Sequence, residues 1–232
     1  MSELDAEALV ALWRRAEAEG TLLAEGPRGR VLRVSYDDES DAVLKSDRPP
    51  DARKRLGALL RGARGARALS AGRALLAAGF RVPEPLGACV HEGLSLHAAR
   101  CVEGPTLSAA LAEADSERAA TLARSAALLA ARLHAAGFVF RDLKPPNLIV
   151  SPAGLVPVDL DDARRSRRVP RRAAWRNLAA LDAYAQLGER PLGVRARLGA
   201  LRVYAVAREA ELGPLLRAVL PLSRAKLARW RR

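Results

Sequence analysis

The stretch VFRDLKPPNLIV, residues 139–150, constrains the fold more than any other part of the chain. It follows a helical pattern and leads into a short β pattern. Its two adjacent prolines oppose an α-helix between these two patterns and favour an extended loop. Asn147 comes five residues after Asp142 and is one of only two asparagines in the protein. Lys144 is one of only four lysines in a chain that otherwise uses arginine. The stretch therefore predicts a loop that presents Asp142, Lys144 and Asn147 together.

The residues after this loop predict a β-hairpin that ends in another acidic residue. NLIV and LVPVDL are short β patterns separated by the turn SPAG, and Asp159 lies at the end of the second. Such a hairpin brings Asn147 and Asp159 together as oxygen donors, the ligands that Mg²⁺ prefers. Asp142, apart on the loop, is suited to orienting a hydroxyl group and accepting its proton. Lys144 places positive charge where a transferred phosphoryl group develops negative charge.

The remaining patterns divide the chain into a β-rich half and a helical half. We predict a β-rich lobe with an N-terminal extension helix over residues 1–101, and a compact helical lobe over 102–232. The most regular helix spans 116–136, with Ser116 as its N-cap and Gly137 as its stop. The other predicted elements are a helix over 4–19, β runs over 21–45, a helix over 51–79, two strands within 85–104, and helices from about 172.

These motifs resemble those of protein kinases. FRDLKPPN resembles the kinase catalytic loop, and VDLD takes the place of the Asp-Phe-Gly motif. AVLK resembles the strand whose lysine holds the α- and β-phosphates, EGPRGRVLRV lies where the glycine-rich loop belongs, and ARCVEG resembles the hinge that meets adenine. The resemblance covers about residues 20–165 in the correct order.

The resemblance implies an α+β, two-lobed protein-kinase-like fold, with one main helix in the β-rich N-lobe and a mostly helical C-lobe. It implies ATP and Mg²⁺ as cofactors. By position, the implied catalytic residues are Asp142 and Lys144, the metal ligands are Asn147 and Asp159, and the nucleotide-binding residues are Lys45, Gly26, Gly29, Val43, Arg100 and Val102.

Two departures from the kinase pattern bear on activity. Phe140 replaces the histidine that normally steadies the catalytic loop. Between Ala52 and Pro83, in the helix after Lys45, there is no Asp or Glu, and Ala68 or Ser70 stands where kinases have the glutamate that pairs with this lysine. Lys45 must then pair with Asp159 or with the nucleotide itself, or activity is impaired. A pseudokinase that binds nucleotide without transferring phosphate is therefore one alternative.

The length of the C-terminal half points to a compact type of kinase. Only 73 residues follow Asp159, too few for the platform that binds protein substrates, and there is no Ala-Pro-Glu motif. The trimmed lobe, with VDLDDARRS, WRNLAALDAY and RLGALRVYAVA, resembles the lipopolysaccharide-core and Kdo kinase family. This resemblance implies an inner-core sugar, Kdo or heptose, as the acceptor. An atypical Ser/Thr protein kinase is the other alternative, because RDLKPPN with its lysine is closer to protein kinases.

The net charge of +13 favours an anionic partner, although a solvated arginine-rich surface that reflects coding bias is the alternative. Seven arginines lie within residues 163–176, and Arg53, Lys54, Arg55, Arg61, Arg64, Arg67 and Arg73 lie in or before the acid-free helix. Cationic walls suit an anionic lipopolysaccharide sugar and an anionic membrane surface, and argue against cationic aminoglycosides. We expect no nucleic-acid partner, since no binding motif accompanies the charge.

The chain shows no pattern that would take it across a membrane or into an oxidising compartment. It has no apolar run long enough for a spanning helix, and its acidic, amphipathic N-terminus is no secretory signal. Cys89 and Cys101 are too few for a disulfide framework. We therefore predict a cytoplasmic protein, with peripheral contact at the inner-membrane face. His134 is interpreted as a helix-end residue, and His91 and His97 as strand or turn residues.

Overall fold

A computed structural model of the chain describes residues 3–38, 40–48, 62–187 and 190–231. The chain forms two compact units, Met1–Val102 with Asp159–Asp162, and Glu103–Val158 with Ala163–Arg232. The short segment Asp159–Asp162 thus belongs to the first unit, although its neighbours in sequence on both sides belong to the second. None of the helices in the described ranges is long and apolar enough to cross a membrane.

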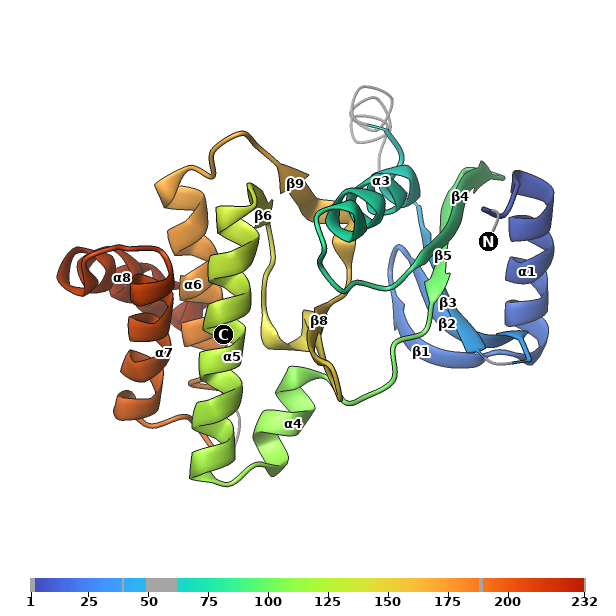
Figure 1. Cartoon of the computed structure of the whole chain (residues 1–232). Helices are drawn as coiled ribbons and strands as arrows, with labels where there is room; N and C mark the ends of the chain where they lie inside the picture. The colour runs from blue at the N-terminus through green and yellow to red at the C-terminus, as the bar shows by residue number, and fades with distance from the viewer. Residues whose placement is uncertain (1–2, 39, 49–61, 188–189, 232) are drawn as a thin grey trace. The chain divides into compact units, whose positions relative to one another are not determined.

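The first unit is built on an antiparallel five-stranded sheet with the order β1-β2-β3-β5-β4 (Figure 1). Its strands are β1 (Thr21–Gly26), β2 (Gly29–Asp37), β3 (Ser40–Asp47), β4 (Pro85–His91) and β5 (Leu94–Arg100). The predicted β-rich first half is confirmed, as are the two strands predicted within 85–104. The strand pairing places β3 between β2 and β5, so this strand has neighbours on both sides.

Helix α1 (Ala6–Glu19) covers one face of this sheet, as Figure 1 shows. Asp5 caps its N-terminus by accepting a hydrogen bond from the amide of Ala8 at 2.8 Å. The helix packs its apolar stripe on alternate residues of the strands. The core so formed contains Leu9, Leu12, Trp13, Ala16, Leu32, Val34, Ala42, Leu44, Leu86, Leu96 and Ala98. Because side chains alternate along a strand, the residues between these core positions face away from α1.

Helix α3 (Arg64–Ala77) is the part of the predicted 51–79 helix that the structure describes; residues 51–61, with Arg53, Lys54, Arg55 and Arg61, lie outside the described ranges. Small residues on its buried face allow a close approach to the sheet. A Cβ added at Gly65 would lie 2.3 Å from the carbonyl oxygen of Leu96 on β5. Gly72 is likewise buried, and an added Cβ there would lie 3.3 Å from the Pro85 side chain. The helix therefore lies close to β4 and β5.

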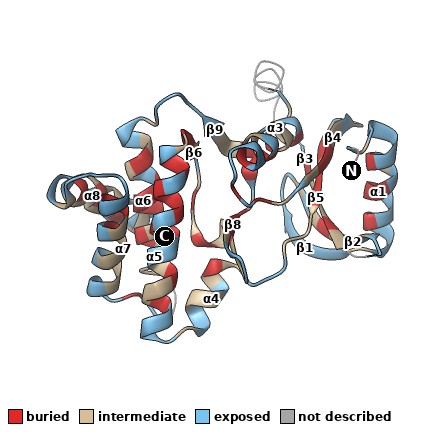
Figure 2. Cartoon of the chain, viewed as in Figure 1, coloured by how far each residue is buried: buried red, intermediate tan, exposed pale blue. Residues whose placement is uncertain are grey.

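The second unit is mostly helical, as predicted. Its helices are α4 (Leu107–Glu113), α5 (Ser116–Ala135), α6 (Arg171–Tyr184), α7 (Val194–Ala207) and α8 (Leu212–Trp230). Figure 2 shows that α5 and α6 turn buried residues toward the interior of this unit. The predicted N-cap of α5 is wrong by one residue: Asp115, not Ser116, accepts the amide of Arg118 at 2.7 Å. A carboxylate also matches the positive end of the helix dipole.

Two small hairpin-like pairs complete the second unit. β7 (Leu148–Ser151) pairs with β8 (Gly154–Pro157), which confirms the predicted hairpin. β6 (Phe138–Phe140) pairs with β9 (Ala163–Arg165) in antiparallel register. Between β6 and β7 the chain forms a short 3-10 turn, η1 (Pro145–Asn147). A second such turn, η2 (Leu160–Asp162), belongs to the first unit.

Candidate active site

Val43 and Lys45 lie on the same face of β3, opposite the face that α1 covers. The strand register places Val31 of β2 and His97 of β5 beside Lys45, and Ala99 of β5 beside Val43. Arg33 of β2 also lies beside Val43. This face therefore combines apolar side chains with Lys45, Arg33 and His97. Val43 and Lys45 were predicted from the sequence, but their cross-strand neighbours were not. Predicting those neighbours requires the register between β2, β3 and β5 as well as the alternation along each strand.

Lys45 forms an ion pair with Asp159, within the first unit. Asp159 is one of the two partners that the sequence suggested for this lysine, and the structure pairs the two residues. Asp159 has a backbone φ of 59°, in the left-handed region that non-glycine residues rarely adopt. Such conformations are concentrated at functional sites, where the surrounding structure holds them in place.

The first turn of α3 supplies cations rather than the carboxylate that kinases use. Ala68 is buried against the sheet and Ser70 is exposed, so neither position can pair with Lys45. Arg64 instead donates to Asp47 at the end of β3, at 2.8 Å, and to the carboxylate of Asp161. Where kinases have a glutamate on the helix that pairs with a lysine of the sheet, this helix therefore carries an arginine that pairs with aspartates of β3 and η2.

Burial shifts the pKa values of two titratable groups in or near this network. The pKa of His97 is lowered to about 4 because burial disfavours the charged ring and Lys45 repels it, while Asp159 acts in the opposite direction. His97 is thus neutral at pH 7, and its Nε2 atom is buried without a hydrogen-bond partner among the described residues. Burial raises the pKa of Asp161, and the charge of Asp159 adds to this, whereas Lys45 and Arg64 oppose it.

Gly26 and Gly29 flank the two-residue turn that joins β1 to β2, at the position predicted for a glycine-rich loop. Gly29 is required by close packing, because an added Cβ would lie 2.0 Å from the carbonyl oxygen of Ser46 on β3. No such restriction applies at Gly26, where an added Cβ would meet no described atom within 4 Å. The turn is therefore held against the end of the strand that carries Lys45, through the close packing of Gly29 and through a hydrogen bond of 2.7 Å from the amide of Arg48 to the carbonyl oxygen of Arg28.

The predicted hinge residues lie at the end of β5. The amide of Arg100 already donates to the carbonyl oxygen of Glu84 at 2.8 Å, so it cannot donate to adenine. The Arg100 side chain pairs with Asp37 at 2.9 Å and with Glu84 at 3.1 Å. If this residue contacts a nucleotide base, it must do so through its carbonyl group, and Val102 remains the predicted donor.

The catalytic-loop residues lie together in the second unit. Lys144 pairs with Asp142 at 2.6 Å. The side-chain nitrogen of Asn147 donates to the carbonyl oxygen of Asp142 at 3.0 Å, and its backbone amide donates to the carbonyl oxygen of Lys144 at 2.9 Å. Because the amide nitrogen of the Asn147 side chain is used in holding the loop, its oxygen is the atom that can bind a cation.

A buried polar network contacts the backbone of Phe140, the residue that stands where kinases have a histidine. The side chain of Asn177 on α6 donates to the carbonyl oxygen of Phe140 at 2.5 Å and accepts its amide at 3.4 Å. His134 binds the Asn177 oxygen through Nε2 at 3.0 Å and the Tyr204 hydroxyl through Nδ1 at 2.9 Å. The interpretation of His134 as a structural residue is confirmed, and Asn177 is a positioning residue that the sequence analysis missed.

The β7–β8 hairpin fixes the segment that leads to Asp159. Leu148 pairs with Pro157, and the amide of Val158 donates to the carbonyl oxygen of Asn147 at 2.9 Å. Asp159 is the next residue in the chain. The backbone of one predicted metal ligand, Asn147, is therefore hydrogen-bonded to the residue that directly precedes the other, Asp159. Both offer oxygen atoms, the donor type that fits Mg²⁺.

Comparison with known proteins decides which family carries this arrangement. The family described as "Lipopolysaccharide kinase (Kdo/WaaP) family" matches residues 52–196. The chain belongs to the lipopolysaccharide kinase (Kdo/WaaP) family. A comparison with curated proteins gave no match. This member of the Kdo/WaaP family is a kinase-like phosphotransferase, as its catalytic-loop motif predicted.

Among solved structures, this Kdo/WaaP family member is similar to an aminoglycoside-3'-phosphotransferase of type VIII. The TM-score is 0.63 with 17% sequence identity, over 93% of this chain and 98% of the other. At this identity the likeness shows the fold alone, and it confirms the predicted two-lobed, protein-kinase-like fold.

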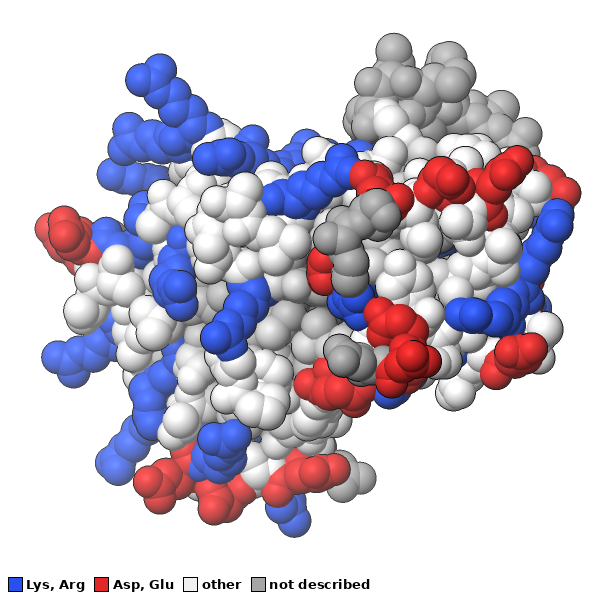
Figure 3. Space-filling model, turned by 45° about the vertical axis from the view of Figure 1, so that its right-hand side comes forward, with Lys and Arg blue, Asp and Glu red and all other residues white. Residues whose placement is uncertain are grey.

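The second unit of the kinase carries a strongly basic surface segment. Seven exposed arginines lie on β9, on the segment that follows it and on the first turns of α6, namely Arg164, Arg165, Arg167, Arg168, Arg171, Arg172 and Arg176. Figure 3 shows many lysine and arginine side chains projecting from the surface. The segment begins on β9, where Arg164 pairs in register with Val139 and Ala163 with Phe140. Since β6 leads directly to Asp142, the arginines start beside the catalytic loop.

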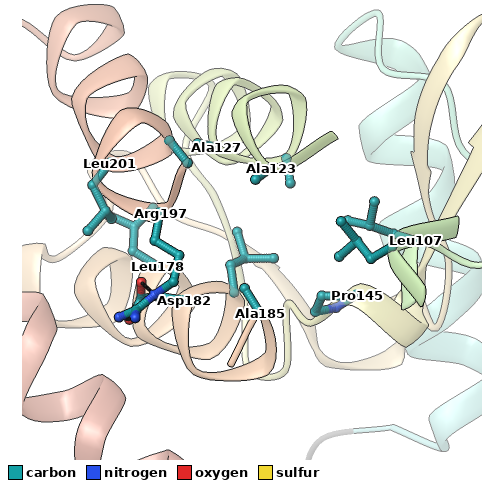
Figure 4. Close-up of a pocket in the computed structure, with 13 residues that line it drawn as sticks. Leu107, Ala123, Ala127, Pro145, Leu178, Asp182, Ala185, Arg197 and Leu201 are labelled. Atoms are coloured by element: carbon teal, nitrogen blue, oxygen red, sulfur yellow. Dashed lines mark hydrogen bonds and ion pairs between the residues drawn. The ribbon is translucent and has the colours of Figure 1, made fainter. Parts of the chain in front are cut away.

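A small apolar cavity also lies within the second unit of the kinase, between α4, α5, α6, α7 and η1 (Figure 4). Its volume is about 40 Å³, too small for a nucleotide or a sugar. Asp182 and Arg197 line it and bind one another at 2.9 and 3.1 Å. Ser223 and Gln186 also donate to Asp182, so this buried carboxylate has its partners within the fold. The cavity is thus a packing feature of the helices.

Proposed function

We propose that this protein transfers the γ-phosphoryl group of ATP to a hydroxyl group of a lipopolysaccharide inner-core sugar, Kdo or heptose. The observation that carries the proposal is the pairing of β6 with β9, which starts the arginine segment beside the strand that leads to Asp142. An acceptor that carries carboxylates or phosphates would find charge-assisted hydrogen bonds there. A cationic acceptor would be repelled.

Asp142 is proposed to orient the acceptor hydroxyl and to accept its proton, since its carboxylate is partly exposed on a loop that Asn147 holds. Lys144 is proposed to contact the transferred phosphoryl group. It pairs with Asp142 at 2.6 Å, and the phosphoryl group of a bound nucleotide would draw it away and leave the carboxylate able to accept a proton. Catalysis then rests on positioning and on charge stabilisation.

Lys45 is proposed to bind the α- and β-phosphates, and Val43 with its apolar neighbours to contact the base. Gly26, Gly29, Arg100 and Val102 complete the proposed nucleotide-binding set. Asn147 and Asp159 would hold Mg²⁺, which neutralises phosphate charge when it is bound.

The charges near Asp142 also support an anionic acceptor. Lys226 on α8 lies among Asp142, Lys144 and Arg176, whose charges act on it. Its ammonium group lies 5.3 Å from the centre of the Trp230 ring. Cationic groups from the loop, from α6 and from α8 therefore lie within electrostatic range of one another, and the proposed base is among the charges that act on Lys226. We propose that they bind the acceptor, and that the arginine segment gives peripheral contact with the anionic inner surface of the membrane.

The experiment that tests the proposal is phosphate transfer from γ-labelled ATP to four acceptors. These are a Kdo-containing lipid A precursor, an isolated heptose-containing core oligosaccharide, a cationic aminoglycoside and a generic protein substrate. We expect Mg²⁺-dependent transfer to one of the first two. Asp142→Asn should abolish it while leaving ATP binding intact, and the exposed Asp38→Asn should behave as wild type.

The other outcomes separate the alternatives. Transfer to the protein substrate alone would make this an atypical Ser/Thr protein kinase, and transfer to the aminoglycoside alone would refute the charge argument. ATP binding without transfer to any acceptor would favour a pseudokinase. Equal transfer by Asp142→Asn would refute the role of Asp142.

A further inference from the structure

We propose that Arg64 is a positioning residue of this kinase, and that it connects α3 to the metal-binding turn in place of the glutamate that other kinases carry on this helix. The inference rests on the proposed function, because it assigns Arg64 a role in holding the turn that presents Asp159. It concerns a contact that is internal to the first unit.

Arg64 joins three segments of the first unit. Its NH1 atom lies 2.8 Å from Oδ1 of Asp47 at the end of β3, and its Nε atom donates to Oδ2 of Asp161 in η2. Both partners are well buried, with side-chain exposures of 12% for Asp47 and 5% for Asp161. A guanidinium group can bind two carboxylates in fixed directions, which a lysine cannot do.

Helix α3 also holds η2 by other contacts. Nε of Arg67 donates to the carbonyl oxygen of Asp161 at 3.1 Å. Leu160 lies against the helix, since a Cβ added at Gly72 would be 3.5 Å from its Cδ1 atom. Side-chain, backbone and apolar contacts therefore fix Asp161 and Leu160 to α3. Asp159, which precedes them, keeps its left-handed backbone conformation only while this turn is held.

The charges divide the work between two ion pairs. Lys45 pairs with Asp159, and Arg64 pairs with Asp161, although the two aspartates are only two residues apart. Arg64 thus neutralises the buried carboxylate and leaves Asp159 as the carboxylate that faces the nucleotide lysine. Without Arg64, the buried charge of Asp161 would lack this partner, and a buried unpaired charge strongly favours rearrangement.

The test measures the affinity of the full-length protein for a non-hydrolysable ATP analogue by calorimetry, with and without Mg²⁺. We expect Arg64→Ala to weaken binding with Mg²⁺ by about 10–100-fold, the usual effect of removing a residue that orients a metal ligand. Binding without Mg²⁺ should change much less. Added guanidinium at low, non-denaturing concentration should restore part of the Mg²⁺-dependent affinity, whereas sodium chloride at equal ionic strength should not.

Three further variants make the test specific. Arg64→Lys keeps the charge but not the fork, so partial loss is expected. Asp161→Asn should reproduce the loss from the other side of the pair, and it applies even where Arg64→Ala does not fold. Arg73→Ala is the matched control, because this arginine of the same helix pairs with Glu3 and is more than half exposed.

The results distinguish this inference from the proposed function. Folded Arg64→Ala with wild-type Mg²⁺-dependent affinity would overturn the inference alone. Equal weakening with and without Mg²⁺, or an equal loss in Arg73→Ala, would overturn it as well, since either indicates a merely structural effect. A wild-type protein that binds no nucleotide would refute the proposed function, and the inference with it.

Discussion

The side chain of Asn177 binds both backbone groups of Phe140, although the two residues are 37 positions apart. Phe140 stands two residues before Asp142, so this contact sets the backbone from which the catalytic loop departs. Kinases commonly use a histidine at the Phe140 position, and here the polar group comes from α6 instead. The loop is therefore positioned from the helical core of the second unit.

Replacing Asn177 by leucine should destabilise the protein and impair the loop. The variant leaves two buried backbone groups and His134 without their partner, which we expect to lower the free energy of unfolding by about 2–4 kcal/mol. Urea unfolding measures this change. Ser151→Ala is the control, because it removes an exposed hydrogen bond of 2.8 Å in the β7–β8 hairpin and should matter little. Similar losses in both variants would contradict the role of Asn177.

Lys226→Ala should weaken acceptor binding while leaving ATP binding unchanged. The lysine lies among the charges around Asp142, so its loss should raise the KM for an anionic acceptor by about tenfold, the effect of one hydrogen bond to a charged group. Steady-state kinetics at fixed ATP measure it. The exposed Arg224 on α8 is two residues away and thus on another face, so Arg224→Ala should have a smaller effect. A matching rise in the KM for ATP would show that Lys226 is not specific to the acceptor.

Two glycine substitutions should have effects of opposite sign. In Gly65→Ala the new Cβ would lie 2.3 Å from the Leu96 carbonyl oxygen, which should lower the free energy of unfolding by about 1–3 kcal/mol through displacement of α3. In Gly199→Ala, on α7, the new Cβ meets no described atom within 4 Å. Alanine should stabilise that helix by about 0.5–1 kcal/mol. Thermal unfolding measures both effects. A change of the same sign in both variants would contradict the prediction.

The stability of the protein should fall as the pH is lowered below the ordinary pKa of a histidine side chain. The pKa of His97 is about 4 in the folded protein, compared with a reference value of 6.5. Between these values the unfolded chain binds a proton that the folded protein does not, so stability decreases as the pH falls through this window. The contribution of His97 is at most about 3 kcal/mol.

His97→Gln should therefore reduce the loss of unfolding free energy between pH 7 and pH 4, measured by urea titration at several pH values. His91→Gln, at the end of β4, serves as the control for removing a histidine. An unchanged pH profile in His97→Gln would show that the ring is not held neutral by the fold.

Local patterns predicted much of the architecture because they depend on short segments. The alternation in β2 and β3, the stripe of α5 and the hairpin after Asn147 each follow from neighbouring residues, and each is confirmed. The N-cap of α5 was displaced by one residue, because Asp115 and Ser116 are both good capping residues and only the backbone turn selects between them.

By itself, the sequence determined the reaction class: Asp142, Lys144 and Asn147 are fixed by spacing on a proline-held loop, and the family match agrees with that assignment. Only the tertiary structure decided which residues hold them and their partners. Asn177 reaches Phe140, and Arg64 reaches Asp161, across 37 and 97 positions of sequence. Such contacts depend on how helices pack against strands and turns, which no local pattern encodes. Lys45 pairs with Asp159 for the same reason, because the sheet register and the return of Asp159–Asp162 to the first unit bring them together.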